Sequence, residues 1–287
     1  MHIPVLPDEV LEYLEVSRGG FFLDGTTGLG GHSSLILEAS PQNYIYGTDK
    51  DTEALVIAQK KLEAFPGRFT LFHSDYRDIE SLPVALDRID GFLFDLGVSS
   101  FQLDNPEKGF SFSKEAPLDM RMDKTQPKSA YDVVNTYSYD ELSRVLKDYG
   151  EFDHPDRIIQ QIIGQRKLNK ITTTNELKTI IRRICPQQKT MDPLARVFQA
   201  IRIEVNQELE NLERFFLRII EVMKPGARIV IISFHSLEDR IVKNALKEAK
   251  DKKLIGILTK KPVTAQDKEL EANPRSRSAK LRAAVKI

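Results

Sequence analysis

A glycine-rich turn between an apolar strand and a helix occupies residues 21–33, which read Phe-Phe-Leu-Asp-Gly-Thr-Thr-Gly-Leu-Gly-Gly-His-Ser. Gly28, Gly30 and Gly31 let the backbone bend sharply and approach a ligand without Cβ atoms in the way, and the amide groups of the following helix point at an anionic group. A simple strand-to-helix connection has the same pattern, so the turn alone is a weak signal. It favours a βαβ unit that binds a nucleotide-type cofactor.

An acidic residue closes the next apolar run, residues 44–49, which we predict to be the second strand. Asp49 lies 19 residues beyond Gly30, the separation at which a βαβ unit places a carboxylate on ribose hydroxyls. We therefore expect Asp49 to bind the ribose of the cofactor. Asp51 is closer to the amphipathic run of residues 52–64 and is the expected cap of that helix.

Length and composition place the chain among globular proteins. Its 287 residues suffice for one large or two modest domains, with 41% hydrophobic and 29% charged residues. A single cysteine, Cys185, excludes an internal disulfide and a metal site built from several cysteines. No apolar run reaches membrane-spanning length, and the first residues do not begin a signal peptide. We expect a cytoplasmic protein with no membrane partner.

Apolar strands and helical patterns alternate along the chain, which is typical of a parallel sheet. Runs at residues 69–73, 91–96 and 227–234 predict three further strands, and runs near 254–259 and 279–287 predict a closing hairpin. The result is an α/β fold with seven strands and an antiparallel end. By analogy of fold, it suits a methyltransferase better than a dehydrogenase.

Well over 100 residues separate the fourth strand from the fifth, far more than a crossover helix needs. The interval therefore predicts an inserted helical domain. Helical apolar spacing recurs there at residues 139–149, 157–166, 175–184 and 193–220, with Asp140, Asp156 and Thr174 as expected caps.

Polar segments follow the fourth and fifth strands, at residues 95–104 and 233–240. Ligands bind outside the carboxyl ends of the strands in open α/β sheets. We therefore expect both segments to lie beside the glycine turn.

The chain resembles the bacterial S-adenosylmethionine-dependent methyltransferases of 16S (small-subunit) ribosomal RNA that modify N4 of a cytidine in the decoding region, the RsmH/MraW type. The resemblance spans nearly the whole chain in long ungapped stretches, which are far more specific than a glycine turn. These are residues 2–6, 24–33, 95–104, 109–112, 117–123, 198–203, 205–206, 233–243 and 273–282.

This resemblance implies a Rossmann-like class I methyltransferase domain, residues 1–105 and 206–287, interrupted by a helical substrate-recognition domain, residues 106–205. It implies S-adenosylmethionine as the cofactor and no metal. The implied cofactor contacts are Gly30, Gly31 and His32 for the methionine part, Asp49 for the ribose, Tyr76 and Asp95 for the adenine side, and Gln102 to complete the pocket.

Methyl transfer to a cytosine amino group requires alignment of the nitrogen with the methyl–sulfur bond and an acceptor that pulls on the N–H bonds. Asp95 is the first candidate acceptor by position, and Asp119 and Asp123 compete with it. The latter two fit equally well as helix caps or as partners of Arg121. His235 follows the fifth strand and is a candidate for contact with the base, although we favour a role in bracing its loop.

A flipped base needs apolar walls around the pocket that receives it. Phe101, Phe110 and Phe112 are candidates for these walls, with core packing as the alternative.

Basic residues are concentrated in two stretches, although the net charge is zero. Residues 155–200 hold nine basic and three acidic side chains, and residues 273–287 hold five basic side chains and no acidic one. RNA phosphates would bind such stretches, with an affinity that falls as salt rises. The expected phosphate ligands are Arg275, Arg277, Lys280 and Arg282. The expected partner is small-subunit ribosomal RNA, within the small ribosomal subunit.

Two other function classes stay open. A nicotinamide-dependent oxidoreductase would use the same turn and Asp49, but Ser33 replaces the third glycine of the usual dinucleotide fingerprint. A noncatalytic RNA-binding ribosome-assembly factor would use the fold only to bind RNA. An amino-methyltransferase acting on DNA is disfavoured because its Asn/Asp/Ser-Pro-Pro-aromatic signature is absent. The oligomeric state is not fixed by the sequence, and a homodimer is one option.

Overall fold

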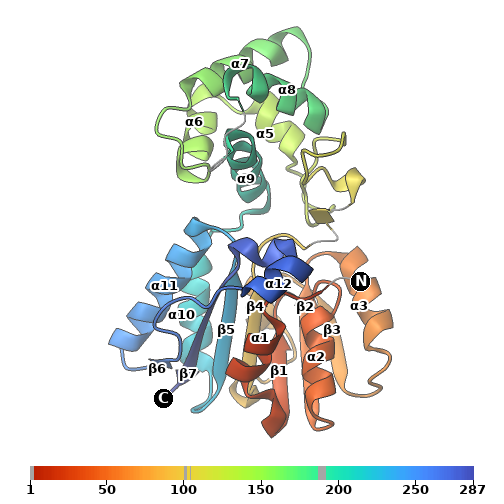
Figure 1. Ribbon diagram of the computed structural model, residues 1–287, viewed down its shortest axis with the longest axis vertical. Coiled ribbons are helices and arrows are strands. Elements are labelled where there is room, and N and C mark those ends of the chain that lie inside the picture. Colours follow the sequence, from red (N-terminus) through yellow and green to blue (C-terminus); the bar gives the residue numbers. More distant parts are fainter. Residues whose placement is uncertain (1–2, 100–101, 104, 187–191) are drawn as a thin grey trace. The chain divides into compact units, whose positions relative to one another are not determined.

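The computed structural model describes residues 3–99, 102–103, 105–186 and 192–287, which form two compact units (Figure 1). One unit comprises residues 1–97 and 211–287, and the other comprises residues 98–210. Each unit has its own apolar core. Within the described ranges, no helix is long and apolar enough to cross a membrane.

The first unit is built on a seven-stranded sheet in the order β3-β2-β1-β4-β5-β7-β6. Strands β1 to β5 pair in parallel, whereas β7 lies antiparallel between β5 and β6. The strands are β1 Gly20–Asp24, β2 Asn43–Asp49, β3 Phe69–His73, β4 Gly91–Asp95, β5 Arg228–Ser233, β6 Ile255–Ile257 and β7 Lys280–Lys286. The predicted Rossmann-like α/β sheet, mostly parallel with an antiparallel end, is confirmed.

Helices cover both faces of this sheet. Phe22 and Val230 point to the face where α1 and α2 pack, whereas the Phe94 ring contacts Phe215 and Phe216 of α10 edge to face. The helices of this unit are α1 Pro7–Leu14, α2 Gly31–Ala39, α3 Thr52–Leu62, α10 Leu212–Val222, α11 Ser236–Asp251 and α12 Asp267–Ala272, with short 3₁₀ helices η1 Val16–Arg18, η2 Tyr76–Ser81, η3 Leu86–Arg88 and η5 Pro274–Ser278.

The second unit is helical. Its helices are α5 Ala130–Thr136, α6 Tyr139–Asp148, α7 Asp156–Leu168, α8 Thr174–Ile184 and α9 Pro193–Asn206, with the 3₁₀ helix η4 Pro106–Lys108. Apolar side chains from α5 to α9 form one core, to which Leu118 and Met120 of the preceding segment contribute. Three of the predicted helices are confirmed, but the run predicted as one helix over residues 193–220 is two helices.

The break in that run follows from the end of α9. Asn206 uses its buried side-chain amide to donate to the carbonyls of Arg202 and Met120, and it accepts from the amide of Met122. The next residue, Gln207, is left-handed, with φ 52°. Apolar spacing continues across this point, so periodicity alone could not reveal the break.

The structure confirms one of the predicted helix caps and moves two others to a neighbouring serine or threonine. Asp51 caps α3 as predicted, accepting from the amides of Glu53 and Ala54. The caps expected at Asp140 and Thr174 are instead at Ser138 and Thr173, each with a glutamate three residues later that completes a capping box.

A third expected cap is also wrong. Asp156 is the first residue of α7 instead of its cap, and Pro155 before it supplies no side-chain hydrogen bond to the described part of this helix. The carboxylate of Asp156 accepts a hydrogen bond from the Tyr139 hydroxyl.

Candidate cofactor and substrate site

The glycine turn joins β1 to α2 at the carboxyl edge of the sheet. Gly28 and Gly30 have φ of 51° and 74°, a region that favours glycine. A Cβ atom on Gly31 would come within 2.9 Å of Pro4, so the start of α2 tolerates no side chain there. Gly30 is the N-cap of α2 and, as a glycine, supplies no side-chain cap. The start of this helix therefore suits an anionic ligand.

A buried carboxylate that sequence reasoning did not assign a role holds this turn. Asp24, at the end of β1, accepts from the amide of Thr26 over 3.1 Å and from the hydroxyl of Ser33 over 2.6 Å. Burial raises the pKa of its carboxyl above the usual value. Its position at a strand end, nine residues before Ser33, was the available signal.

Asp49, the predicted ribose ligand, lies at the end of β2 beside the turn. Its two oxygens accept from the amides of Gly28 over 2.7 Å and Asp51 over 2.8 Å. Burial raises the pKa of Asp49 to about 6. The carboxylate therefore holds the glycine turn to the end of β2, and its contact with the ribose stays a prediction.

His32 and Asp95 face each other beside the turn, with 3.6 Å between His32 Nε2 and Asp95 Oδ2. Among the described residues, neither His32 Nε2 nor Asp95 Oδ1 has a hydrogen-bond partner, although both atoms are buried. The amide of Asp95 donates to the hydroxyl of Thr26, which fixes the end of β4 against the turn. Buried polar atoms without partners are costly, so this pair fits a site completed by the polar groups of a cofactor.

Tyr76 begins η2, just after β3. Its ring meets Phe94 and Phe215 edge to face at centroid distances of 5.8 and 5.2 Å. The Tyr76 Cβ lies 3.1 Å from the position a Cβ on Gly25 would take. The expected stacking residue is thus held against the glycine turn by an aromatic cluster.

Three predicted site residues belong to the second unit and have local partners. Gln102 is buried and accepts from the amide of Ser99 over 3.0 Å. Asp119 accepts two hydrogen bonds from the Arg121 guanidinium, at 2.7 and 3.0 Å. Asp123 accepts from the amide and hydroxyl of Thr125 at 2.8 and 2.7 Å. Asp119 is therefore the partner of Arg121, which was the alternative to a catalytic role.

The candidate aromatic walls are largely core residues. Phe110 is buried in the core of the helical unit, and Phe112 packs edge to face on Phe198 at 5.3 Å. Phe101 lies outside the described residues.

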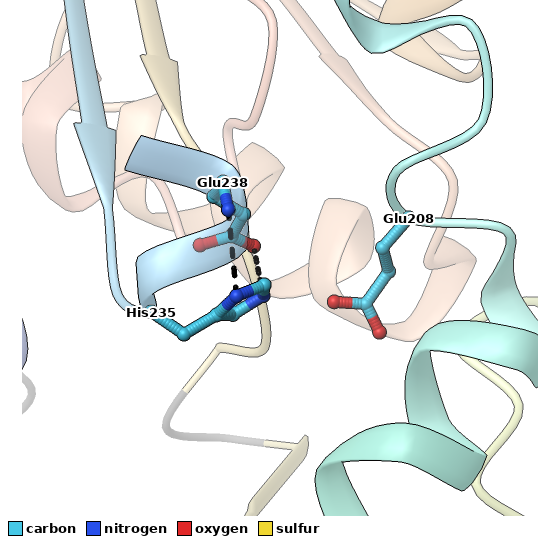
Figure 2. Close-up of side chains that lie close together, drawn as sticks. All are labelled: Glu208, His235 and Glu238. Atoms are coloured by element: carbon cyan, nitrogen blue, oxygen red, sulfur yellow. Dashed lines mark hydrogen bonds and ion pairs between the residues drawn. The ribbon is translucent and has the colours of Figure 1, made fainter. Parts of the chain in front are cut away.

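His235 caps α11, and Figure 2 shows its ring against Glu238. The Glu238 amide donates to His235 Nδ1 over 3.4 Å, and Glu238 Oε1 lies 3.1 Å from Nε2. Glu238 also accepts from the amide of Phe234, so the histidine and glutamate brace the loop after β5, as favoured from sequence. Glu208, also labelled, belongs to the second unit, where its carboxylate accepts from Arg202.

The four predicted phosphate ligands differ in environment. Arg275 and Arg277 are exposed on η5. Arg282, in β7, is only 9% exposed and donates to Asp239 at 2.7 and 3.2 Å. Lys280 is half-buried with its Nζ 3.8 Å from the same carboxylate. The guanidinium of Arg282 is thus paired inside the sheet unit, and its assignment to phosphate binding stays a prediction.

The sheet order and the glycine turn at its carboxyl edge place the first unit in the Rossmann-like α/β class, and the family match makes the chain an S-adenosylmethionine-dependent methyltransferase. The chain belongs to the MraW methylase family, whose model matches residues 1–287. Ribosomal RNA small subunit methyltransferase H of Persephonella marina is 48% identical, with 100% of this chain and 99% of the relative covered.

The protein of the same name from Carboxydothermus hydrogenoformans is 45% identical, with 100% of this chain and 98% of the relative covered. Among solved structures, a putative rRNA-methylase from Clostridium thermocellum aligns with a TM-score of 0.47 and 12% identity, with both chains covered in full. The named relatives favour neither the oxidoreductase nor the noncatalytic assembly factor.

Proposed function

We propose that this methyltransferase transfers a methyl group to the exocyclic N4 of a cytidine in the decoding region of small-subunit ribosomal RNA. The observation that carries the proposal is the His32–Asp95 pair, whose buried, partnerless atoms lie beside the glycine turn. The relatives named as ribosomal RNA small subunit methyltransferase H support the choice of substrate.

The side chains of the first unit divide the work of binding. The Gly30 amide already donates to the carbonyl of Thr27, so the amide of Gly31 would receive the carboxylate of the methionine part, with His32 beside it. Asp49 would accept from the ribose hydroxyls, and Tyr76 would contact the adenine. When bound, S-adenosylmethionine supplies an electrophilic sulfonium methyl group. The residues then have to align the amino nitrogen with that group and exclude water.

Asp95 is the best-placed acceptor for the amino group. The lone pair of a cytosine amino nitrogen is delocalised into the ring, so an acceptor for its N–H bonds raises its reactivity. Asp95 Oδ1 is buried and has no partner among the described residues, whereas Asp119 is engaged by Arg121 and Asp123 by Thr125. His235 Nε2 also has no hydrogen-bond partner among the described residues, but it lies 3.1 Å from Glu238 Oε1 in the pair that braces the loop. Of the three candidate carboxylates, Asp95 therefore has the buried acceptor atom without a hydrogen-bond partner among the described residues.

The RNA partner is proposed to be the small ribosomal subunit, with the exposed Arg275 and Arg277 of η5 on its phosphates. The helical unit, residues 98–210, is proposed to recognise the substrate. Its basic side chains suit contact with a polyanion.

Transfer of a labelled methyl group from S-adenosylmethionine tests the function. The acceptors are small ribosomal subunits and free small-subunit RNA, both from a strain lacking the modification. Nucleoside analysis should show labelled N4-methylcytidine, with more label in the subunits. Label in another nucleoside would contradict the substrate assignment.

Isosteric variants test the acceptor. Asp95→Asn is expected to lower the rate of transfer about a hundredfold. Asp119→Asn and Asp123→Asn serve as matched controls and should retain transfer within about tenfold, because their carboxylates have local partners. A larger loss in Asp119→Asn than in Asp95→Asn would move the acceptor role to Asp119.

A further inference from the structure

The first described residues lie against the glycine turn. We call residues 3–6 the amino-terminal strap. Pro4 of the strap packs so closely on Gly31 that a Cβ there would come within 2.9 Å of the proline ring. Val5 and Leu6 are buried in the same core as Ile36 and Leu37 of α2. The strap therefore contacts the start of α2, where the glycine turn ends.

The other end of the chain holds the strap in place. Glu269 of α12 accepts from the amide of Leu6 over 2.8 Å, across 263 residues of sequence. Asn273, which follows α12, donates from its side-chain amide to the carbonyl of Ile3 over 3.2 Å. Both hydrogen bonds go to the strap backbone, one at each end of the segment.

Leu6 needs such a partner. It is left-handed, with φ 50°, a conformation that a leucine rarely adopts, and it precedes α1. Within the described residues, α1 has no capping side chain at Leu6. A carboxylate at this position is also favoured by the dipole of α1. Glu269 thus satisfies an amide that the strap itself leaves open.

The carboxyl of Glu269 is also electrostatically close to the predicted cofactor ligand His32. Burial raises the pKa of Glu269, Glu9 and Asp8 add to the rise, and His32 opposes it.

We propose that Glu269 and Asn273 are positioning residues for the cofactor: they clamp the strap on Gly31 and so hold the glycine turn in the conformation that binds S-adenosylmethionine. The proposal rests on the assignment of this turn to the cofactor. The strap lies within one of the stretches that carry the family resemblance, residues 2–6, and Asn273 begins another, residues 273–282; His2 lies outside the described residues.

Binding of S-adenosylhomocysteine to the purified full-length protein, measured by calorimetry, tests the proposal without turnover. Glu269→Ala is expected to weaken binding about tenfold, and Asn273→Ala to weaken it less, because its hydrogen bond is longer and exposed. Glu269→Gln keeps an acceptor for the Leu6 amide and should bind close to the wild type. Glu271→Ala, an exposed glutamate of the same helix, is the matched control and should have no effect.

Amide hydrogen exchange of the ligand-free protein separates positioning from general destabilisation. In Glu269→Ala, residues 28–34 should exchange faster, while β4 and β5 keep their wild-type protection. Faster exchange throughout the sheet, with a matching loss of affinity, would overturn the proposal.

A double-mutant cycle tests whether the strap transmits the effect. Pro4→Gly removes the ring that packs on Gly31 and should weaken binding on its own. Combined with Glu269→Ala, the two losses should be clearly less than additive. Fully additive losses, or wild-type affinity in Glu269→Ala, would overturn the positioning role. Failure of the wild type to bind S-adenosylhomocysteine would instead overturn the cofactor assignment.

Discussion

The backbone amide of Gly28 donates a hydrogen bond to Asp49 Oδ2 over 2.7 Å, although 21 residues separate the two positions. The bond ties the glycine turn after β1 to the end of β2, the neighbouring strand. Because the Asp51 amide occupies Oδ1, the carboxylate is oriented before any ligand arrives. A ribose would therefore find the Asp49 carboxylate already oriented. Protonation of this carboxyl would weaken its ability to accept hydrogen bonds from the ribose hydroxyls.

Cofactor affinity is expected to depend on this protonation. The pKa of Asp49 in the ligand-free protein is raised to about 6, so the carboxyl is protonated below that pH and ionised above it. Ribose hydroxyls donate best to the ionised form, so affinity should be full above about pH 7 and fall, at most tenfold per pH unit, as the pH drops through 6. Calorimetry of S-adenosylhomocysteine binding from pH 5 to 8 measures this slope. Asp49→Asn should flatten it, and an unchanged slope in that variant would refute the assignment.

Removal of the His32 imidazole should weaken cofactor binding with little effect on folding. Nε2 of this buried ring lies 3.6 Å from Asp95 Oδ2 and has no hydrogen-bond partner among the described residues, so its hydrogen bond is expected to be made only with the ligand. His32→Ala should therefore weaken S-adenosylhomocysteine binding about ten- to a hundredfold. His73→Ala, which alters an exposed histidine at the end of β3, is the control. Equal affinity of the two variants for S-adenosylhomocysteine would show that His32 does not contribute to cofactor binding.

The sheet and the glycine turn could be predicted because their signals are local. Each parallel strand is an apolar run, and positive φ at Gly28 and Gly30 is the conformation that glycine favours. The placement of β7 between β5 and β6 depends on pairing between distant segments, which periodicity does not encode.

Side-chain roles were harder to predict where they depend on contacts that form only when the chain folds. The carboxylate of Asp119 is chemically suited to act as a catalytic acceptor. In the structure, however, the Arg121 guanidinium donates hydrogen bonds to both of its oxygens. Arg282 belongs to a basic stretch, yet its place in β7 gives it Asp239 as a partner. The contact between Leu6 and Glu269 joins the two ends of the chain and has no local sequence signal at all.

Two arginines of the basic stretch, Arg277 and Arg282, are expected to differ in RNA binding. Arg277 is exposed on η5, so Arg277→Ala should lower the slope of log affinity against log salt by about one, without loss of stability. Arg282→Ala leaves Asp239 without its main partner and should instead destabilise the fold by about 3 kcal/mol. RNA binding over a salt series and thermal unfolding distinguish the two effects. A reduced salt slope for Arg282→Ala in a folded protein would restore it as a phosphate ligand.

A buried carboxylate should make the helical unit sensitive to acid. Glu204 of α9 accepts from the Tyr137 hydroxyl at 2.6 Å, Arg144 at 2.8 Å and Lys128 at 3.0 Å. Although burial opposes ionisation, these donors hold the pKa of Glu204 below its usual value. The stabilisation is therefore present above the unfolded pKa, near 4.5, and is lost as the pH falls through the lower folded value.

Glu204→Gln should reproduce that loss at neutral pH, since it removes the charge that Lys128 and Arg144 face. We expect destabilisation of about 2–3 kcal/mol, seen as faster amide exchange in α5, α6 and α9. Asp148→Asn, at the exposed end of α6, makes the same chemical change without these donors and should leave exchange unaltered. The protection of Glu204→Gln at pH 7 should match that of the wild type only at a pH below the lowered folded pKa of Glu204. If the variant kept wild-type protection, the hydrogen bonds of Glu204 would contribute no net stability to this unit.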